Sequence, residues 1–247
     1  MITTQVMGMV LSAMPIGDYD KRLVILTKEK GKITAFAKGA RKPGSAFLAC
    51  SQPFSFGELS LYEGRNSYNV MSVDIKNYFE ELRKDLEGAY YGFYFCELSD
   101  YLTHENEDGS NTLKLLYQSL RALMQEKIDN KLIRRIFELR MLLIHGYVPQ
   151  VFACVKCNHA EELNFFSIED GGAVCRDCYK KTGNKIIRLS ESSLYAMQYI
   201  ITAPLEKLYT FKVANEVMED LKTCIGDYAN TYFEKRMKSL DLLEKLF

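Results

Sequence analysis

The sequence predicts an α+β protein in which a small β-barrel at residues 1–78 precedes a helical domain at residues 79–247. Three observations predict this division. The first 75 residues contain five short segments rich in β-branched and aromatic side chains, separated by turn sequences. From Phe79 onward, apolar residues recur mostly at helical spacing. Two Cys-x2-Cys pairs interrupt the helical pattern and indicate a metal module at residues 150–182.

Five segments are expected to form the barrel strands: TQVMGMVLSA (4–13), KRLVILT (21–27), KITAFA (32–37), FSFGELSLY (54–62) and SYNVMSV (67–73). Gly31 lies in the short turn KEKGK, where a positive φ is expected. Gly57 interrupts the alternation of its segment and predicts a bulge or a barrel corner. Five such strands fit a small closed or half-closed barrel such as an OB-fold.

Helices are expected in the second domain wherever apolar residues share one face. The first run starts at Phe79, and the acidic stretch ENEDGSN (105–111) ends it. A second and a third helix follow, and the third stops at Gly146, shortly before Pro149. After the cysteines, Ser190 is predicted to cap a helix that Pro204 ends, and residues 211–247 are expected to be helical again.

The four paired cysteines have the spacing Cys-x2-Cys-x17-Cys-x2-Cys and are Cys154, Cys157, Cys175 and Cys178. Each pair can form a tight knuckle, and two knuckles can build a tetrahedral four-thiolate site for one Zn²⁺ ion. Four thiolates leave no open coordination position, so the expected role of the zinc is structural. An iron–sulfur site, unliganded cysteines, or His159 as a replacement ligand are the alternatives.

Composition places the chain among soluble globular proteins. Apolar residues make up 47% of its 247 residues, and charged residues 26%. No apolar run reaches the ~18 residues that a membrane span requires, and the N-terminus lacks a signal-peptide pattern. A cytoplasmic protein without a membrane partner is expected. The three unpaired cysteines, at positions 50, 96 and 224, are interpreted as core residues.

The net charge of zero conceals a basic region near the N-terminus. Between Lys21 and Lys42 the sequence has eight Lys or Arg residues and one acid, Glu29. A positive patch on a neutral protein favours a polyanionic partner for that region alone. Glycines beside basic residues allow a phosphate chain to approach the backbone, and Phe36 and Tyr62 could offer faces on which bases stack. The alternative is a solvated charged loop.

Several enzyme classes lack their motifs in this sequence. There is no GxxxxGK[ST] phosphate loop, no HExxH and no GxSxG. His145, at the end of a helix, is interpreted as structural. An RNA-binding or transcription-associated zinc-ribbon protein and a metal-dependent nuclease remain as alternatives to a non-enzymatic DNA-binding protein.

Three segments together resemble the bacterial RecO family of recombination mediators. They are GDYDKRLVILTKEKGKITAFAKGARKPGSAF (17–47), LLIHGYVPQ (142–150) and the cysteine pairs CVKC and CRDC that follow. The resemblance extends over almost the whole chain in the same order. It implies an N-terminal OB-fold, a helical domain with a four-cysteine zinc module, and no enzymatic turnover.

The resemblance also implies partners in DNA repair. RecO-like proteins of the RecF pathway bind single- and double-stranded DNA, anneal complementary strands, engage RecR and the single-strand binding protein SSB, and help to load RecA. Carried over by position, the residues expected at DNA phosphates are Lys21, Arg22, Lys38, Arg41 and Lys42. The acidic, apolar tail of SSB would need a groove with a basic rim, for which the candidates are Arg134, Arg135 and Arg140.

Overall fold

The computed structural model describes residues 3–65, 67–125, 127–181 and 186–247. The chain divides into two compact units. The first contains the chain up to Met124 together with Met237–Phe247, and the second is Gln125–Arg236. In sequence, the second unit is therefore inserted into the first. The domain boundary expected after residue 78 stays a prediction.

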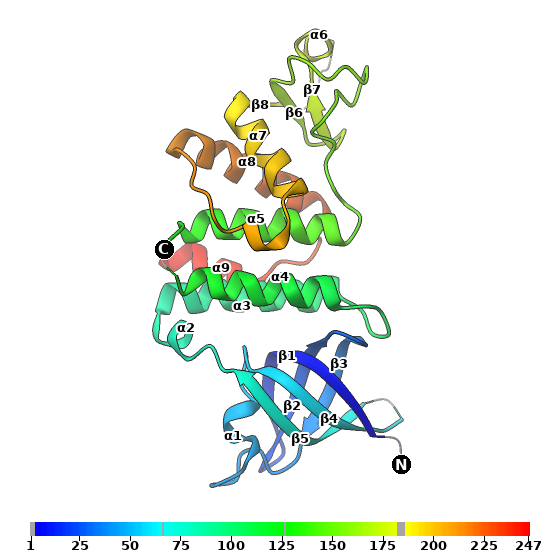
Figure 1. Ribbon diagram of the computed structural model, residues 1–247, viewed down its shortest axis with the longest axis vertical. Helices are drawn as coiled ribbons and strands as arrows, with labels where there is room; N and C mark the ends of the chain where they lie inside the picture. The colour runs from blue at the N-terminus through cyan, green and yellow to red at the C-terminus, as the bar shows by residue number, and fades with distance from the viewer. Residues whose placement is uncertain (1–2, 66, 126, 182–185) are drawn as a thin grey trace. The chain divides into compact units, whose positions relative to one another are not determined.

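The first unit contains a closed five-stranded barrel with strand order β1-β2-β3-β5-β4 (Figure 1). All neighbouring strands are antiparallel except β3 and β5, which close the barrel in parallel through Ala35–Tyr68 and Phe36–Asn69. This is the OB type of Greek-key barrel, and the predicted α+β class is confirmed. The strands are β1 (Thr3–Ile16), β2 (Asp20–Thr27), β3 (Gly31–Ala37), β4 (Phe56–Glu63) and β5 (Tyr68–Asn77), and a short helix α1 (Phe47–Cys50) lies between β3 and β4.

Alternation of apolar residues along the strands places one side chain of every two inside the barrel. β3 shows it most simply, because Ile33, Ala35 and Ala37 are buried while Thr34 and Phe36 are partly exposed. The pairing between β4 and β5 shifts at Gly57, as the sequence predicts. A Cβ atom at this position would lie 2.2 Å from the backbone oxygen of Asp74, so only glycine fits the corner.

Four helices complete the first unit: α2 (Glu80–Lys84), α3 (Leu86–Leu102), α4 (Ser110–Leu123) and α9 (Lys238–Leu246). The run expected from Phe79 is thus two helices, and the prediction of one helix is wrong. The side chain of Asp85 accepts the backbone N–H of Gly88 and caps α3, which separates α3 from α2. α3 packs against α4, α9 and the barrel strand β1 (Figure 1).

The tail predicted to be helical from residue 211 to 247 is also interrupted. Its two helices are α8 (Asn215–Tyr232) and α9, separated by residues 233–237. The two helices belong to different compact units, α8 to the second and α9 to the first. The chain has to leave the helical conformation where it passes from one unit to the other.

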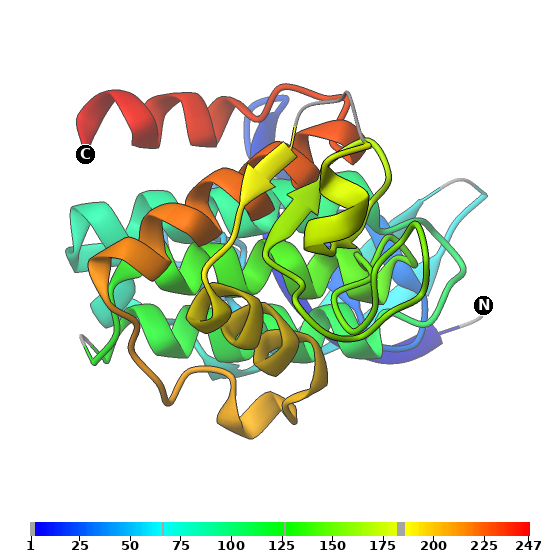
Figure 2. The same cartoon turned by 90° about the horizontal axis from the view of Figure 1, so that it is seen from above.

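The second unit combines helices with a small three-stranded sheet of order β7-β6-β8. Figure 2 shows β8 beside β6, with α6 next to them. Ser190 caps α7 as predicted, because its hydroxyl accepts the N–H of Ser193, and the helix ends before Pro204. The elements are α5 (Asn130–Ile144), β6 (Phe165–Ser167), β7 (Gly172–Val174), α6 (Arg176–Tyr179), β8 (Ile186–Arg188), α7 (Glu191–Thr202), the 3-10 helix η1 (Leu205–Lys207) and α8.

Within the described ranges, no helix has both the length and the apolar character that crossing a bilayer would require.

Candidate nucleic-acid interface and cysteine cluster

The four paired cysteines form one cluster in the second unit. Their sulfur atoms all lie within 4.8 Å of one another, and the Sγ atoms of Cys157 and Cys175 are 3.7 Å apart. In a tetrahedral site with Zn–S bonds of 2.3 Å, sulfur atoms are about 3.8 Å apart. The cluster therefore has the size of a four-thiolate metal site, and its residues can bind a metal ion.

Backbone hydrogen bonds hold the first knuckle against the sheet. Val155 donates its N–H to Ala173 O in β7 at 2.9 Å, and Asn158 donates to Cys154 O at 2.8 Å. Asn158 has a positive φ of 62°, a conformation that asparagine tolerates better than most residues. The side chain of Lys156 pairs with Asp170 in the β6–β7 turn at 2.6 Å. These contacts join the first knuckle to the β6–β7 hairpin.

The electrostatics of the cluster favour a bound cation. Burial raises the pKa of the Cys154 thiol, but N–H groups of Cys175, Lys156 and Cys157 donate to its sulfur and bring the pKa down to about 6. Hydrogen bonding to the sulfur of Cys157, with burial, raises the pKa of Cys178 to about 12. With its pKa raised in this way, Cys178 would ionise at neutral pH only if a divalent cation neutralised the cluster.

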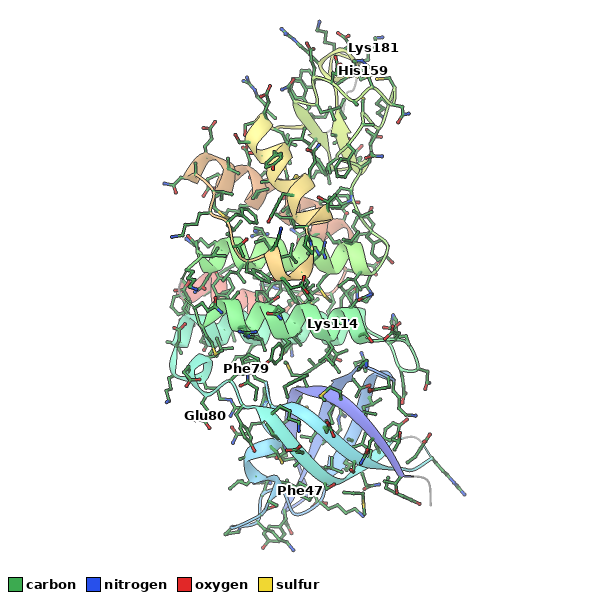
Figure 3. The ribbon with its side chains drawn as sticks, viewed as in Figure 1. Phe47, Phe79, Glu80, Lys114, His159 and Lys181 are labelled. Atoms are coloured by element: carbon green, nitrogen blue, oxygen red, sulfur yellow. The ribbon has the colours of Figure 1, made fainter. Side chains whose placement is uncertain are left out.

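His159 is not part of this cluster among the described residues. Its side chain is exposed, and its backbone oxygen accepts the N–H of Cys154 at 2.8 Å. Figure 3 shows His159 near Lys181 at the α6 end of the module. The ligand set indicated by the geometry is therefore the four cysteines.

The five cations predicted to contact DNA belong to two loops and the strand end between them. The β1–β2 turn with the first residue of β2 (17–20) and the loop after β3 (38–45) are joined by three hydrogen bonds. Arg41 donates its N–H to Tyr19 O at 2.8 Å and its guanidinium to Gly17 O at 3.2 Å. Gly39 donates its N–H to the Asp20 carboxylate at 2.7 Å. We call this end of the barrel, residues 17–22 and 38–45, the basic end.

Each predicted cation has a distinct place at the basic end. Lys38, Arg41, Lys42 and Arg22 are exposed, and Arg22 is paired in register with Phe36. Lys21 is half-buried and donates to Ser51 O at 3.0 Å. Burial, and to a smaller extent the charge of Arg41, lowers the pKa of Lys21. The structure therefore brings these five residues together, and their contact with DNA stays a prediction.

The remaining lysines of the basic sequence region lie at the opposite end of the barrel. The β2–β3 turn docks on the loop between α3 and α4. Beside it, the Lys32 ammonium in β3 pairs with the Asp100 carboxylate in the last turn of α3 at 3.1 Å. The Lys30 ammonium lies 3.9 Å from the Glu63 carboxylate. A Cβ atom on Gly31 would lie 2.1 Å from His104 O, so the docking requires glycine. The basic sequence region between Lys21 and Lys42 is thus divided between the two ends of the barrel.

Figure 3 helps to locate the two ends. Phe47, at the start of α1, lies at the end of the barrel away from Phe79, which precedes α2. Phe47 packs against the barrel core, and the basic loop leads directly into α1. The basic end is therefore the α1 end, and the α3–α4 loop covers the other.

The two aromatic residues predicted to stack on bases lie on the two strands that neighbour β5, on either side of Asn69. Phe36 in β3 and Tyr62 in β4 are both paired with Asn69 in β5. Both rings are partly exposed. Sequence reasoning missed Tyr19, whose side chain is 52% exposed at the basic end. An aromatic residue within the turn sequence PIGDYD was the available signal, because turn side chains usually face solvent.

The three arginines proposed for the SSB tail have partners inside the second unit. Arg134 and Arg135 both pair with the buried carboxylate of Glu138, at 2.9 and 2.7 Å. The Arg140 guanidinium donates to the backbone oxygens of Ile200 and Ile201 at the end of α7. Their contact with SSB stays a prediction. An apolar groove of about 680 Å³ lies elsewhere, between α7 and α8, and its lining includes Tyr195, Phe211 and Lys212.

Two family models match successive parts of the chain. The model "Recombination protein O N terminal" matches residues 1–79, and "Recombination protein O C terminal" matches residues 83–241. The chain belongs to the RecO family. This family comprises DNA repair and recombination proteins, and the expected resemblance is confirmed.

Curated relatives match the chain over nearly their whole length. The chain is 31% identical to the DNA repair protein RecO of Acetivibrio thermocellus, over 97% of this chain and 95% of the relative. It is 31% identical to that of Alkaliphilus metalliredigens, over 97% and 98%. For Symbiobacterium thermophilum the identity is 32%, over 97% and 96%.

Proposed function

We propose that this chain is a non-enzymatic mediator of DNA repair and recombination in the RecF pathway. It binds single- and double-stranded DNA, anneals complementary strands, and acts with RecR and SSB to promote the loading of RecA. Membership of the RecO family supports this function over an RNA-binding or a nuclease function. The proposed location is the cytoplasm, at the nucleoid.

One observation carries the DNA-binding part of the proposal. The basic end gathers five cations and two carboxylates, and one of the carboxylates, Asp20, is used to hold the loop backbone at Gly39. The phosphates of DNA would replace counterions around the exposed side chains of Lys38, Arg41 and Lys42. The hydrogen bonds between the two loops fix the loop backbone and the Arg41 guanidinium before DNA arrives, which lowers the entropy lost on binding.

Annealing follows from the same surface without a chemical step. Two complementary strands repel each other, and a positive surface that binds both screens this repulsion. Pairing then becomes effectively intramolecular, at a raised local concentration. Neither hydrolysis nor a cofactor is needed for this activity.

The proposed ion in the cysteine cluster is one structural Zn²⁺. Four thiolate ligands fill a tetrahedral shell and leave no position for a reactive water. The three short strands, the four-residue helix and the cluster share a small core, which includes Leu163 and Val174. The bound metal would supply the folding free energy that this small core lacks.

The DNA-binding proposal is tested by changing the number of phosphate contacts. Substitution of both Lys38→Ala and Arg41→Ala should weaken binding equally for every sequence. The slope of log K against log salt should flatten by about 1.4 for single strands and about 1.8 for duplex. The matched control is Lys28→Ala with Lys30→Ala, which removes the same charge from the opposite end of the barrel.

The outcome is measured by fluorescence anisotropy of labelled DNA over a salt series, with thermal melting to show that each variant is folded. A slope that is unchanged in the first variant, or that flattens equally in the control, would remove the basic end from the DNA interface.

A further inference from the structure

Tyr19 is the single aromatic residue of the basic end, residues 17–22 and 38–45. Its side chain is 52% exposed, although tyrosine rings more often bury most of their apolar surface. It lies in the β1–β2 turn, between Gly17, which has a positive φ of 53°, and Asp20. Three more exposed apolar side chains come from the neighbouring chain segments: Met14, Ile16 and Leu48.

The position of Tyr19 is fixed by the loop after β3. Its backbone oxygen accepts a hydrogen bond from the N–H of Arg41. The guanidinium of Arg41 donates a second hydrogen bond to the backbone oxygen of Gly17 in the same turn. The ammonium of Lys42 lies 5.3 Å from the centre of the Tyr19 ring, a cation–π distance. The ring is thus held next to two of the cations proposed to contact phosphates.

Proteins that bind single-stranded nucleic acid combine aromatic and cationic side chains in this way. Its bases are unstacked and expose flat faces, and its phosphates follow at short intervals along the backbone. A base stacked on the Tyr19 ring would place adjacent phosphates near Lys42 and Arg41. In a duplex the bases are stacked on one another, so the same ring would find no free base face.

We propose that Tyr19 is a base-stacking residue that gives the basic end a preference for single-stranded over duplex DNA. The inference rests on the proposed DNA-binding function and names the form of DNA that this site selects. Arg41 and Lys42 contribute to the binding of both forms of DNA through the phosphates, whereas Tyr19 contributes to the binding of single strands alone.

The test uses the absence of tryptophan from the sequence. In a Tyr19→Trp variant the new indole is the only tryptophan of the full-length protein, and a stacked base should quench its fluorescence. The probes are an oligothymidylate of about 16 nucleotides, an abasic deoxyribose-phosphate strand of equal length, and a duplex of equal length. The control is Tyr195→Trp, which places the indole on α7 in the second unit, at a side chain that is 68% exposed.

Quenching of the indole at position 19 by oligothymidylate, but not by the abasic strand or the duplex, is the expected result. Equal quenching by all three probes would overturn the stacking role. If no probe quenches the indole while anisotropy still reports DNA binding, the stacking role is also overturned. The proposed DNA-binding function would then stand without it. Absence of binding in the unmodified protein would overturn both proposals.

A second measurement separates stacking from charge. Tyr19→Ala should weaken single-strand binding at least about fivefold, leave duplex binding unchanged, and leave the salt slope unchanged because no cation is lost. Tyr19→Phe should retain the affinity, since the ring is kept. An equal loss for single strands and duplex, or a loss in Tyr19→Phe as large as in Tyr19→Ala, would contradict the inference.

Discussion

The carboxylate of Glu97 in α3 accepts hydrogen bonds from the backbone N–H and the hydroxyl of Ser239 in the first turn of α9, at 2.9 and 2.5 Å. It also accepts the N–H of Lys238 at 3.2 Å. The residue that precedes α9, Met237, offers no capping side chain. A residue 142 positions earlier in the sequence therefore supplies the cap of this helix.

Substitution of Glu97→Ala is predicted to destabilise α9. The unpaired N–H groups and the lost favourable charge at the helix N-terminus should lower the free energy of unfolding by about 1 kcal/mol. Amide hydrogen exchange should become faster in residues 241–246 before it changes in the barrel. Glu97→Gln, which keeps an acceptor, should have a smaller effect.

The matched control for this prediction is Glu234→Ala, which removes an exposed carboxylate between α8 and α9. If exchange in α9 is the same in the Glu97 and Glu234 variants, the cap contributes nothing measurable.

The cysteine cluster predicts a metal-dependent stability of the second unit. Cys154→Ser should release the bound metal and lower the melting temperature, because the module has a small core of its own. DNA affinity should change little, since the basic end belongs to the first unit. Metal content is measured by atomic emission, and an unchanged content would refute the ligand assignment.

Thiol reactivity gives an independent measure of the same site. Chelation should expose the four cluster thiols to a thiol reagent. Burial raises the pKa of Cys96 and, to about 12, that of Cys224, so these thiols should stay unreactive at neutral pH. They should react only in denaturant. Labelling of Cys96 or Cys224 in the folded protein, located by mass spectrometry, would contradict their assignment as core residues.

The buried Glu138 predicts a large stability effect in α5. Its side chain is 2% exposed, and its carboxylate pairs with Arg134 and Arg135. Glu138→Ala would leave the Arg135 charge buried without this partner, and should destabilise the protein by about 3–5 kcal/mol. Replacing all three charged residues together, Arg134→Leu, Arg135→Met and Glu138→Leu, should have a much smaller effect.

Urea unfolding followed by circular dichroism measures both variants. A Glu138→Ala variant as stable as the unmodified chain would mean that the pair is solvated in solution. The arginines would then again be available as a rim for the SSB tail.

Local signals were sufficient for most of the fold. The strand segments, the corner at Gly57 and the cap at Ser190 each depend on a few neighbouring residues, and the structure has all three. The metal cluster was predictable for the same reason, because each pair of ligands is close in sequence.

Relationships between distant segments were not predictable. Lys32 faces Asp100 only because the α3–α4 loop docks on the β2–β3 turn, so the basic region is divided in a way that its composition does not indicate. The burial of Arg135 and Glu138 also contradicts the ordinary expectation that charged residues on a helix face solvent. The start of α9 is capped by Glu97 in α3, and no local sequence pattern near α9 indicates this distant partner.

The insertion of the second unit between α4 and α9 also determines when the first unit can be completed during synthesis. A ribosome translates the barrel and α3 first, then all of residues 125–236, and only afterwards the helix that packs on α3. Domains generally fold as they emerge. The face of α3 that α9 covers therefore stays exposed in the nascent first unit until α9 has been synthesised. A premature stop within the inserted segment would therefore leave an incomplete barrel unit that chaperones and proteases can recognise.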